Sequence, residues 1–265
     1  MFTVAEAYER DMGRWSKLLA PLFVEFVGVR EGDCVLDAGC GTGSLTETVA
    51  RITGASKIVG IDRSKGFIDY ARSHKSGARV IFELGDAQNL PYPEESFDRC
   101  LALLIMNFIP DAPKAAREMR RVTRSGGVVG TAMWDNSGGN ELNQCLWDAA
   151  IALDPKVIRP DERVGSFGSP ETLKTLWAGA GFTSIEVTDL TFPCEFSSFD
   201  EMWLRRYIEG QGPGAAFVVG LPEDHREALR QRMRRDILGG CPDGPFTLKA
   251  KAWAVRGIVP LKNKY

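Results

Sequence analysis

The sequence is poor in histidine and has no closely spaced cysteines, and these shortages exclude several kinds of site. Its two histidines, His74 and His225, lie far apart, and none of its six cysteines forms a pair separated by two residues. Such a pair is typical of zinc ligands and of disulfide oxidoreductases. A chain of 265 residues can also bury a large apolar core without a disulfide framework. We therefore expect free thiols in a cytoplasmic protein, and no metal.

Long apolar runs and a strong charge imbalance are missing too. The most apolar early stretch, residues 18–29, contains Pro21 and Glu25 and is too short to cross a membrane. Charged residues near the start, among them Arg10 and Asp11, are unlike a secretory leader. The net charge is −2, whereas general nucleic-acid binders are usually strongly basic. We expect no membrane and no nucleic acid as partner, and either a monomer or a homodimer.

Strand-like and helix-like segments alternate through the first half of the chain. The expected strands are residues 34–37, 57–62, 79–83, 97–104 and 127–132, and the expected helices are residues 44–53, 65–74 and 114–122. This alternation predicts βαβ units, and hence an α/β fold with a parallel sheet and helices on both faces. The loops that follow such strands gather at one edge of the sheet, where ligands bind.

The remaining segments are less regular. Helices are expected over residues 6–27, 170–180, 199–208 and 222–238, and strands over residues 183–192 and 246–255. No repeat or low-complexity linker separates them, so we expect one domain. Its expected parts are an N-terminal helical lid (1–30), a cofactor-binding core (31–192), a helical insert (193–245) and a final strand (246–265).

The strongest motif is a glycine-rich turn at Gly39, Gly41 and Gly43. An apolar strand precedes this turn and a helix follows it, which is the context of a nucleotide-binding turn. Asp62 ends the next strand, about 20 residues further on, where an acceptor for ribose hydroxyls would lie. The motif predicts a nucleotide-like cofactor at this edge of the sheet.

The spacing and charge of the turn favour S-adenosylmethionine (SAM) over a dinucleotide. The dinucleotide pattern is G-x-G-x-x-G/A, but Ser44 stands where its last small residue belongs. Asp37 precedes the glycines, and its carboxylate would repel a pyrophosphate but attract the ammonium and sulfonium of SAM. A structural role for Asp37 as a turn-forming residue is the alternative.

Several motifs, in this order, resemble those of class I SAM-dependent methyltransferases. Residues 35–46 resemble the first motif of that family, residues 60–62 its ribose-binding strand end, and residues 85–88 its adenine-binding turn. Residues 96–104 resemble its fourth strand. Residues 121–127 resemble the turn before its fifth strand, although Ser125 replaces the expected proline. The small-molecule methyltransferases of ubiquinone and menaquinone biosynthesis are the most similar group.

The resemblance implies a Rossmann-like, doubly wound sheet of seven strands, mostly parallel, with an antiparallel last strand. It implies methyl transfer from SAM to a small-molecule acceptor by in-line displacement, with S-adenosylhomocysteine (SAH) as product. The implied cofactor-binding residues are Asp37, Ala38, Gly39, Cys40, Gly41, Asp62, Arg63, Asp86, Ala87, Gln88 and Leu103. Aromatic and polar residues near the expected methyl position are predicted to contact the acceptor, namely Tyr8, Arg14, Trp15, Met106, Asn107, Phe108 and Trp134.

Neither the acceptor nor a catalytic residue is identified by the sequence. No side chain is assigned as a general base, which is compatible with an acceptor that needs none. Two other functions stay open. A non-catalytic or regulatory SAM-binding protein would share the fold and the cofactor site. An NAD(P)-dependent oxidoreductase would share the fold, but the glycine spacing disfavours it.

Overall fold

The computed structural model describes residues 5–262 except 76, 137, 160–166 and 211. The chain divides into two compact units, which are treated separately below. Unit 1 comprises residues 1–15, 135–164 and 191–251, and unit 2 comprises residues 16–134, 165–190 and 252–265. The single-domain organisation and its four expected parts stay predictions.

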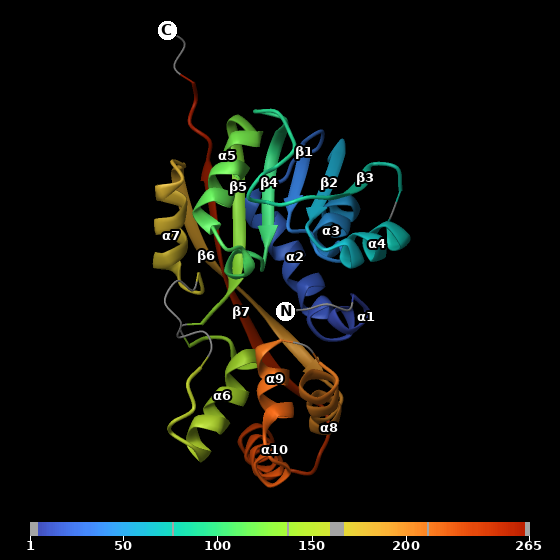
Figure 1. Cartoon of the computed structure of the whole chain (residues 1–265), viewed down its shortest axis with the longest axis vertical. Coiled ribbons are helices and arrows are strands. Elements are labelled where there is room, and N and C mark those ends of the chain that lie inside the picture. The colour runs from blue at the N-terminus through green and yellow to red at the C-terminus, as the bar shows by residue number, and fades with distance from the viewer. Residues whose placement is uncertain (1–4, 76, 137, 160–166, 211, 263–265) are drawn as a thin grey trace. The chain divides into compact units, whose positions relative to one another are not determined.

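A seven-stranded sheet has the order β3-β2-β1-β4-β5-β7-β6, and Figure 1 shows its strands. The strands are β1 (Cys34–Ala38), β2 (Lys57–Asp62), β3 (Val80–Leu84), β4 (Phe97–Leu103), β5 (Thr123–Trp134), β6 (Thr183–Phe196) and β7 (Phe246–Ile258). Parallel pairing joins the first five strands of this order, and β7 runs antiparallel to β5. The predicted doubly wound, mostly parallel sheet with an antiparallel last strand is confirmed.

Helices cover both faces of the sheet within unit 2. They are α2 (Arg14–Val27), α3 (Ser44–Ile52), α4 (Lys65–His74), α5 (Ala112–Val122) and α7 (Pro170–Gly179). Successive residues of a strand point to opposite faces. On β5, Gly130 faces α2, because a Cβ on this glycine would lie 2.8 Å from Val27. The neighbouring Val129 faces the other side of the sheet and belongs to the core with Trp177 of α7. Because both faces are covered, β1 and β2 are buried over nearly their whole length.

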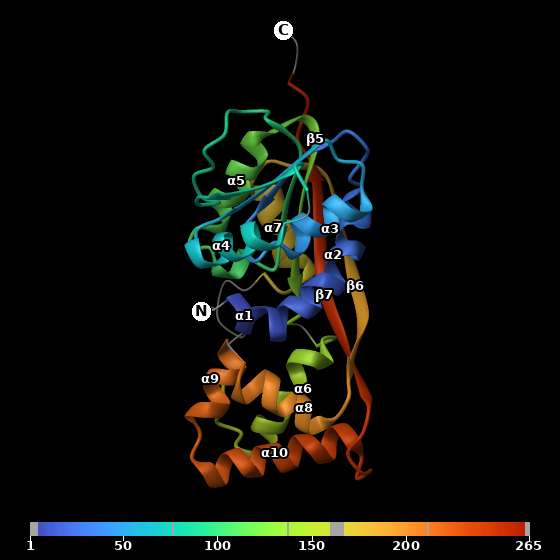
Figure 2. The same ribbon diagram turned by 90° about the vertical axis from the view of Figure 1, so that its right-hand side faces the viewer.

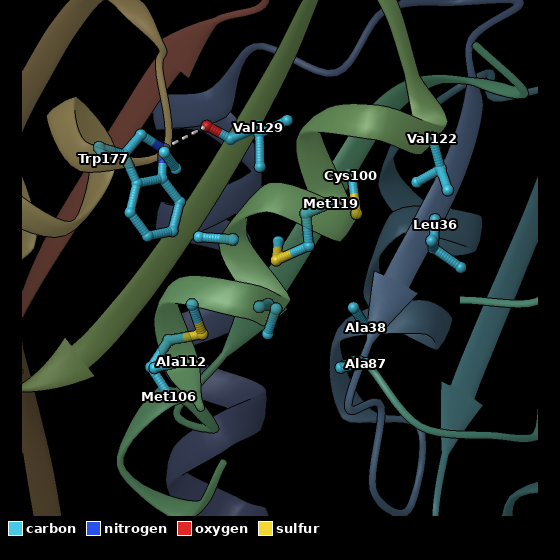
Figure 3. Packing of buried hydrophobic residues seen from close by; sticks show 14 of the residues in the cluster. Leu36, Ala38, Ala87, Cys100, Met106, Ala112, Met119, Val122, Val129 and Trp177 are labelled. Atoms are coloured by element: carbon cyan, nitrogen blue, oxygen red, sulfur yellow. Dashed lines mark hydrogen bonds between the residues drawn. The ribbon is translucent and has the colours of Figure 1, made fainter. Parts of the chain in front are cut away.

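The main core of unit 2 lies between the sheet and the helices α5 and α7. Figure 3 shows Met119 of α5 and Trp177 of α7 among the buried side chains that face β1 and β5. The indole Nε1 of Trp177 donates a hydrogen bond of 3.1 Å to the carbonyl of Val129. This bond satisfies the polar atom of a fully buried aromatic residue, so the indole can fill the core without an unpaired donor.

Helices make up most of unit 1. Within its described residues these are α1 (Ala5–Tyr8), a π-helical segment (Glu9–Gly13), α6 (Glu141–Leu153), α8 (Phe199–Trp203), a second π-helical segment (Leu204–Ile208), α9 (Pro213–Gly220) and α10 (Glu223–Leu238). Figure 2 shows α10 running beneath α6, α8 and α9. The sequence predicted the helical segments at 199–208 and 222–238 but neither α6 nor α9. Among the described residues, no helix is both long and apolar enough to cross a membrane.

Candidate cofactor site

The glycine-rich turn joins β1 to α3 in unit 2. Gly39, Gly41 and Gly43 have φ angles of 80°, 55° and 96°, the left-handed region that favours glycine. The amides of Gly39 and Cys40 donate to the carbonyl of Ile61, at 2.7 and 3.0 Å. These two bonds fasten the turn to the carboxyl end of the neighbouring strand β2.

The space around the three glycines differs from one to the next. A Cβ on Gly39 would lie 2.6 Å from Cγ1 of Ile105, and a Cβ on Gly43 would lie 2.8 Å from Cζ of Phe82. A Cβ on Gly41 would have its nearest neighbour, in Phe67, only at 4.0 Å. Packing therefore requires two of the glycines, whereas Gly41 leaves its backbone open to the approach of a ligand.

Asp62, at the end of β2, binds the backbone on two sides. Its Oδ2 accepts a hydrogen bond of 2.9 Å from the amide of Gly41, and its Oδ1 accepts one of 2.7 Å from the amide of Ser64. The residue is 7% exposed, and this burial raises the pKa of its carboxyl although both amide bonds lower it. A carboxylate has about four acceptor positions, so the two oxygens of Asp62 can also accept from ligand hydroxyls.

Asp37, which precedes the glycines, is buried and only half satisfied. Its Oδ2 accepts a hydrogen bond of 2.6 Å from Oγ1 of Thr46, whereas its Oδ1 is buried with no hydrogen-bond partner. Burial raises the pKa of the carboxyl to about 7, against the opposing effect of the Thr46 bond, and nearby Asp62 adds to the rise. An unpaired buried acceptor is costly, and a cation beside it would relieve that cost. The site therefore suits an ammonium and disfavours a pyrophosphate.

The turn after β3 carries the third predicted group of cofactor residues. Asp86 is exposed, and its Oδ1 accepts a hydrogen bond of 2.8 Å from the amide of Gln88. The side-chain Oε1 of Gln88 accepts one of 3.0 Å from the amide of Asp111, at the start of α5. Ala87 between them is 8% exposed and belongs to the core cluster. Internal bonds and the burial of Ala87 thus give this turn a fixed shape.

The structure brings all the predicted cofactor residues to one edge of one unit. The neighbouring parallel strands β3, β2, β1 and β4 carry them at their carboxyl ends. Asp37 and Ala38 end β1, Arg63 follows β2 as an exposed residue, and the half-buried Leu103 ends β4. Their contact with a cofactor stays a prediction.

The residues predicted to contact the acceptor are divided between the units. Met106 is fully buried in the core of unit 2 (Figure 3), whereas Asn107 and Phe108 are exposed. Oδ1 of Asn107 accepts a hydrogen bond of 2.8 Å from the amide of Phe167, and half-buried Trp134 ends β5. The other three, Tyr8, Arg14 and Trp15, belong to unit 1. Contact with an acceptor stays a prediction for all seven residues.

Two residues at this edge were assigned no role from the sequence. Thr46 is fully buried, and its hydroxyl donates to Asp37. In the sequence, only its position nine residues after Asp37 in the same motif indicates this role. Leu104, which follows β4, has a φ of 61°, and its amide donates to the carbonyl of Ala132 at 2.8 Å. Backbone strain of this kind clusters at functional sites, but a leucine in a sequence gives no sign of it. Among the described residues, no cluster of His, Cys, Asp and Glu could hold a metal ion.

Comparisons with known proteins identify relatives of this chain. A family model described as "Methyltransferase domain" matches residues 35–127. The chain is 33% identical over 251 residues to malonyl-[acyl-carrier protein] O-methyltransferase of Serratia marcescens, a match covering 93% of this chain and 86% of that protein. It is 40% identical over 112 residues to methyltransferase GfsG of Streptomyces halstedii, but that match covers only 41% of this chain and 40% of the relative. The chain thus aligns with less than half of GfsG.

A solved structure supports the fold independently. The YcgJ protein of Bacillus subtilis aligns over 92% of this chain and 99% of its own, with a TM-score of 0.58 and 20% sequence identity. At that identity, the likeness concerns the fold alone.

Proposed function

The chain belongs to the class I SAM-dependent methyltransferases, and we propose that it methylates a small-molecule acceptor by in-line displacement, releasing SAH. The observation that carries this proposal is the half-satisfied carboxylate of Asp37 beside the open backbone of Gly41. SAM is cationic at both its ammonium and its sulfonium, so a buried anion with an unused oxygen is the partner that it needs.

Each predicted cofactor residue except Gly39 has a proposed role. Asp37 would pair with the ammonium, and the carboxylate of Asp62 would accept from ribose hydroxyls while it holds the amide of Gly41 in place. Asp86 and the amide of Ala87 or Gln88 would bind the adenine edge, and the apolar side chain of Leu103 would pack against the cofactor. Arg63, Ala38 and Cys40 would contribute contacts along the two strand ends.

The chemistry asks little of the protein beyond alignment. SAM supplies an electrophilic methyl group that an oxygen, nitrogen, sulfur or carbon nucleophile can attack directly. Holding two reactants in line can lower a barrier by about 7–11 kcal/mol in the best cases, without any covalent participation by the enzyme. A general base is required only where the acceptor carries a proton that must leave during attack. We assign no residue to that role.

Within unit 2, we propose that the acceptor contacts two exposed residues that follow β4 and the half-buried residue that ends β5. Asn107, Phe108 and Trp134 offer a polar group and two aromatic rings there. Met106 would act through packing beneath them, since its own side chain is fully buried. The small-molecule class of acceptor is supported by relatives such as the demethylmenaquinone methyltransferase of Lactobacillus johnsonii, which is 28% identical to this chain over 184 residues.

Calorimetric titration with SAH tests the cofactor assignments. We expect Asp62→Asn to weaken SAH binding by about 10- to 100-fold, the usual effect of losing hydrogen bonds to a charged group. A matched control is Asp69→Asn, because Asp69 is a half-exposed residue of α4 paired with Lys65 and should leave binding unchanged. If Asp62→Asn bound SAH as tightly as the control, the ribose assignment would be wrong.

A further inference from the structure

The carboxylate of Asp37 lies on the face of the sheet that α3 covers. Asp37 on β1 pairs in register with Gly60 on β2, and Gly60 pairs in register with Phe82 on β3. Side chains at paired positions of parallel strands point to the same face of the sheet. A Cβ on Gly60 would meet Thr46 of α3, so this is the face beneath that helix. Asp37 and Thr46 therefore meet in the interior of unit 2, where both are buried.

The missing side chain of Gly60 makes room for the hydroxyl of Thr46. A Cβ on Gly60 would lie 2.8 Å from Oγ1 of Thr46 and 2.8 Å from Cδ1 of Phe82. Glycine weakens a strand and often marks such a close approach. In the space that it leaves, Oγ1 of Thr46 donates the hydrogen bond of 2.6 Å to Oδ2 of Asp37. Gly60 therefore contributes to this hydrogen bond by its lack of a Cβ.

The hydroxyl of Thr46 has a different kind of partner from that of a second threonine on the same helix. Thr48 is also buried, and its Oγ1 donates a hydrogen bond of 2.8 Å to the carbonyl of Ser44, four residues before it. This arrangement is usual for a threonine in a helix. Thr46 instead donates out of the helix to Asp37 of β1. Its hydrogen bond therefore serves the carboxylate rather than the helix.

The electrostatic surroundings of Asp37 make this donor important. Burial raises the pKa of Asp37 to about 7, and the hydrogen bond from the side chain of Thr46 is the largest opposing effect. Three titratable groups interact with the carboxyl, namely Asp62 of β2, Cys40 of the glycine-rich turn and Cys100 of β4. Burial raises the pKa of both thiols well above the usual range, so they stay neutral, and Asp62 adds negative charge. None of these three groups favours the ionised form of Asp37, whereas Thr46 does.

We propose that Thr46 is a positioning residue for the cofactor: its hydroxyl fixes the carboxylate of Asp37 through Oδ2 and leaves Oδ1 to pair with the ammonium of SAM. Groups that bind a ligand are commonly held in place by a supporting hydrogen bond of this kind. Oδ1 is the oxygen of Asp37 that has no hydrogen-bond partner among the described residues. The same bond favours the ionised carboxylate, which a cation requires. This inference rests on the proposed function, because it presumes that Asp37 binds the cofactor.

Calorimetric titration with SAH over a range of pH tests the proposal in Thr46→Val, which keeps the branched shape but removes the donor. The quantity compared is the pH midpoint, at which SAH affinity has fallen to half its value at high pH. Without the donor, the pKa of Asp37 rises further, so the midpoint should move up by about one pH unit. The loss of affinity should be about fivefold at pH 7 and small at about pH 9, where Asp37 is ionised in both proteins. Thr46→Ser keeps a hydroxyl and should restore the wild-type midpoint.

Thr48→Val is the matched control, because it removes a buried threonine hydroxyl from the same helix that does not contact Asp37. Its midpoint should equal that of the wild type. Equal midpoints in Thr46→Val and Thr48→Val, or a loss in Thr46→Val that is the same at every pH, would overturn the proposal. A wild type that does not bind SAH, or binds it without any dependence on pH, would contradict the proposed pairing of Asp37 with the cofactor, and this inference with it.

A second variant acts on the same hydrogen bond without changing either partner. In Gly60→Ala the Cβ would displace the hydroxyl of Thr46, so the midpoint should move up as in Thr46→Val. Gly130→Ala is its control, because a Cβ there would lie 2.8 Å from Val27, on a strand two places from that of Asp37. Both substitutions crowd the interior, so an effect of lost stability would appear in both. A midpoint that moves in neither variant, or equally in both, would contradict the role given to Thr46.

Discussion

Asp37 carries a cost in stability that the proposed pairing with a cation would offset. A carboxyl group that is 1% exposed, with one oxygen unpaired, is held in its charged form only weakly, and burial raises its pKa to about 7. An ordinary structural aspartate at a strand end would not be left in this state, because its second oxygen would find a donor. A cation supplied by the ligand would give the second oxygen of Asp37 a partner and so remove the cost of burying it unpaired.

If Asp37 pairs with the cofactor, the affinity for the cofactor should depend on pH. Because a cation pairs only with the ionised form of Asp37, SAH affinity should fall as the pH drops through about 7, by up to about tenfold per pH unit. Titration calorimetry from pH 5.5 to 8.5 measures this. In Asp37→Asn the affinity should be weaker and nearly independent of pH. A pH-independent affinity in the wild type would contradict the role given to Asp37.

The same variant should change the stability of the ligand-free protein in the opposite direction. The folded-state pKa of Asp37 lies above its ordinary value, so its contribution to stability is full below about pH 4 and is lost as the pH rises through about 7. Asp37→Asn removes that loss while its side-chain oxygen can still accept from Thr46. At pH 8 we expect the variant to be more stable by up to about 4 kcal/mol, measured by urea unfolding. At pH 4 the gain should vanish, and an equal gain at both pH values would point to another cause.

Two glycines of the turn should respond differently to the same substitution. Gly43→Ala places a Cβ 2.8 Å from Phe82 and should cost more than about 2 kcal/mol of stability. Gly41→Ala meets only Phe67, at an ordinary contact distance of 4.0 Å, so it should cost about as much as Gly32→Ala, a control that also has positive φ and has no neighbour within 4 Å. Gly41→Ala should nevertheless weaken SAH binding, because its methyl group fills the ligand's approach. Thermal unfolding and calorimetry together decide, and wild-type SAH affinity in Gly41→Ala would contradict this assignment.

At the scale of elements, α5 holds the turn that carries the predicted adenine contacts. Arg121 donates to the carbonyls of Leu90 and Tyr92, at 2.9 and 2.8 Å, and pairs with Glu118 at 2.7 Å. Glu118 in turn accepts a hydrogen bond of 2.9 Å from the amide of Leu90. One ion pair on a helix therefore satisfies both backbone groups of Leu90, four residues beyond Asp86.

Loosening this attachment should affect cofactor binding more than turnover. We expect Arg121→Gln to raise the KM for SAM about fivefold with little change in kcat, because the adenine turn loses its anchor while the reacting groups stay in place. Arg117→Gln, on the exposed side of the same helix, is the matched control. Steady-state kinetics at varied SAM concentration separates the two parameters. An equal KM in both variants would remove Arg121 from any positioning role.

The elements that were predicted well are those whose pattern is local. Helix α4 has the bounds expected from the sequence, since Ser64 caps it and its apolar residues recur at helical spacing. Helix α9 was missed because it begins at Pro213 and Gly214 in a glycine-rich stretch, which reads as a loop. Strand β6 continues to Phe196 through Pro193, a residue that commonly ends a strand in a sequence-based reading. Its edge position explains this, because an edge strand can lose one amide donor.

At the scale of the whole molecule, the sequence predicted the strands and turns at this edge of unit 2 far better than it predicted the helices of unit 1. The glycine turn and the acids at the strand ends stand at fixed distances in the chain, so their meeting follows from the parallel sheet alone. Unit 1 is assembled from three separate segments of the chain, and the packing of α6 with α10 joins residues some distance apart in sequence. No short-range pattern encodes such contacts, which is why the packing of Trp15 against Phe196 could not be predicted.

The central claim is that the edge of unit 2 holds SAM, and thermal unfolding of the full chain with SAM, SAH, NAD⁺ and NADPH in parallel tests it most directly. A ligand at about 100 times its dissociation constant adds about 2.7 kcal/mol, which for a chain of this size corresponds to a rise of about 5–10 °C. We predict this rise with SAM and SAH only, and its loss in Gly41→Ala. A rise with the nicotinamide cofactors, or no rise with any of the four ligands, would contradict the account.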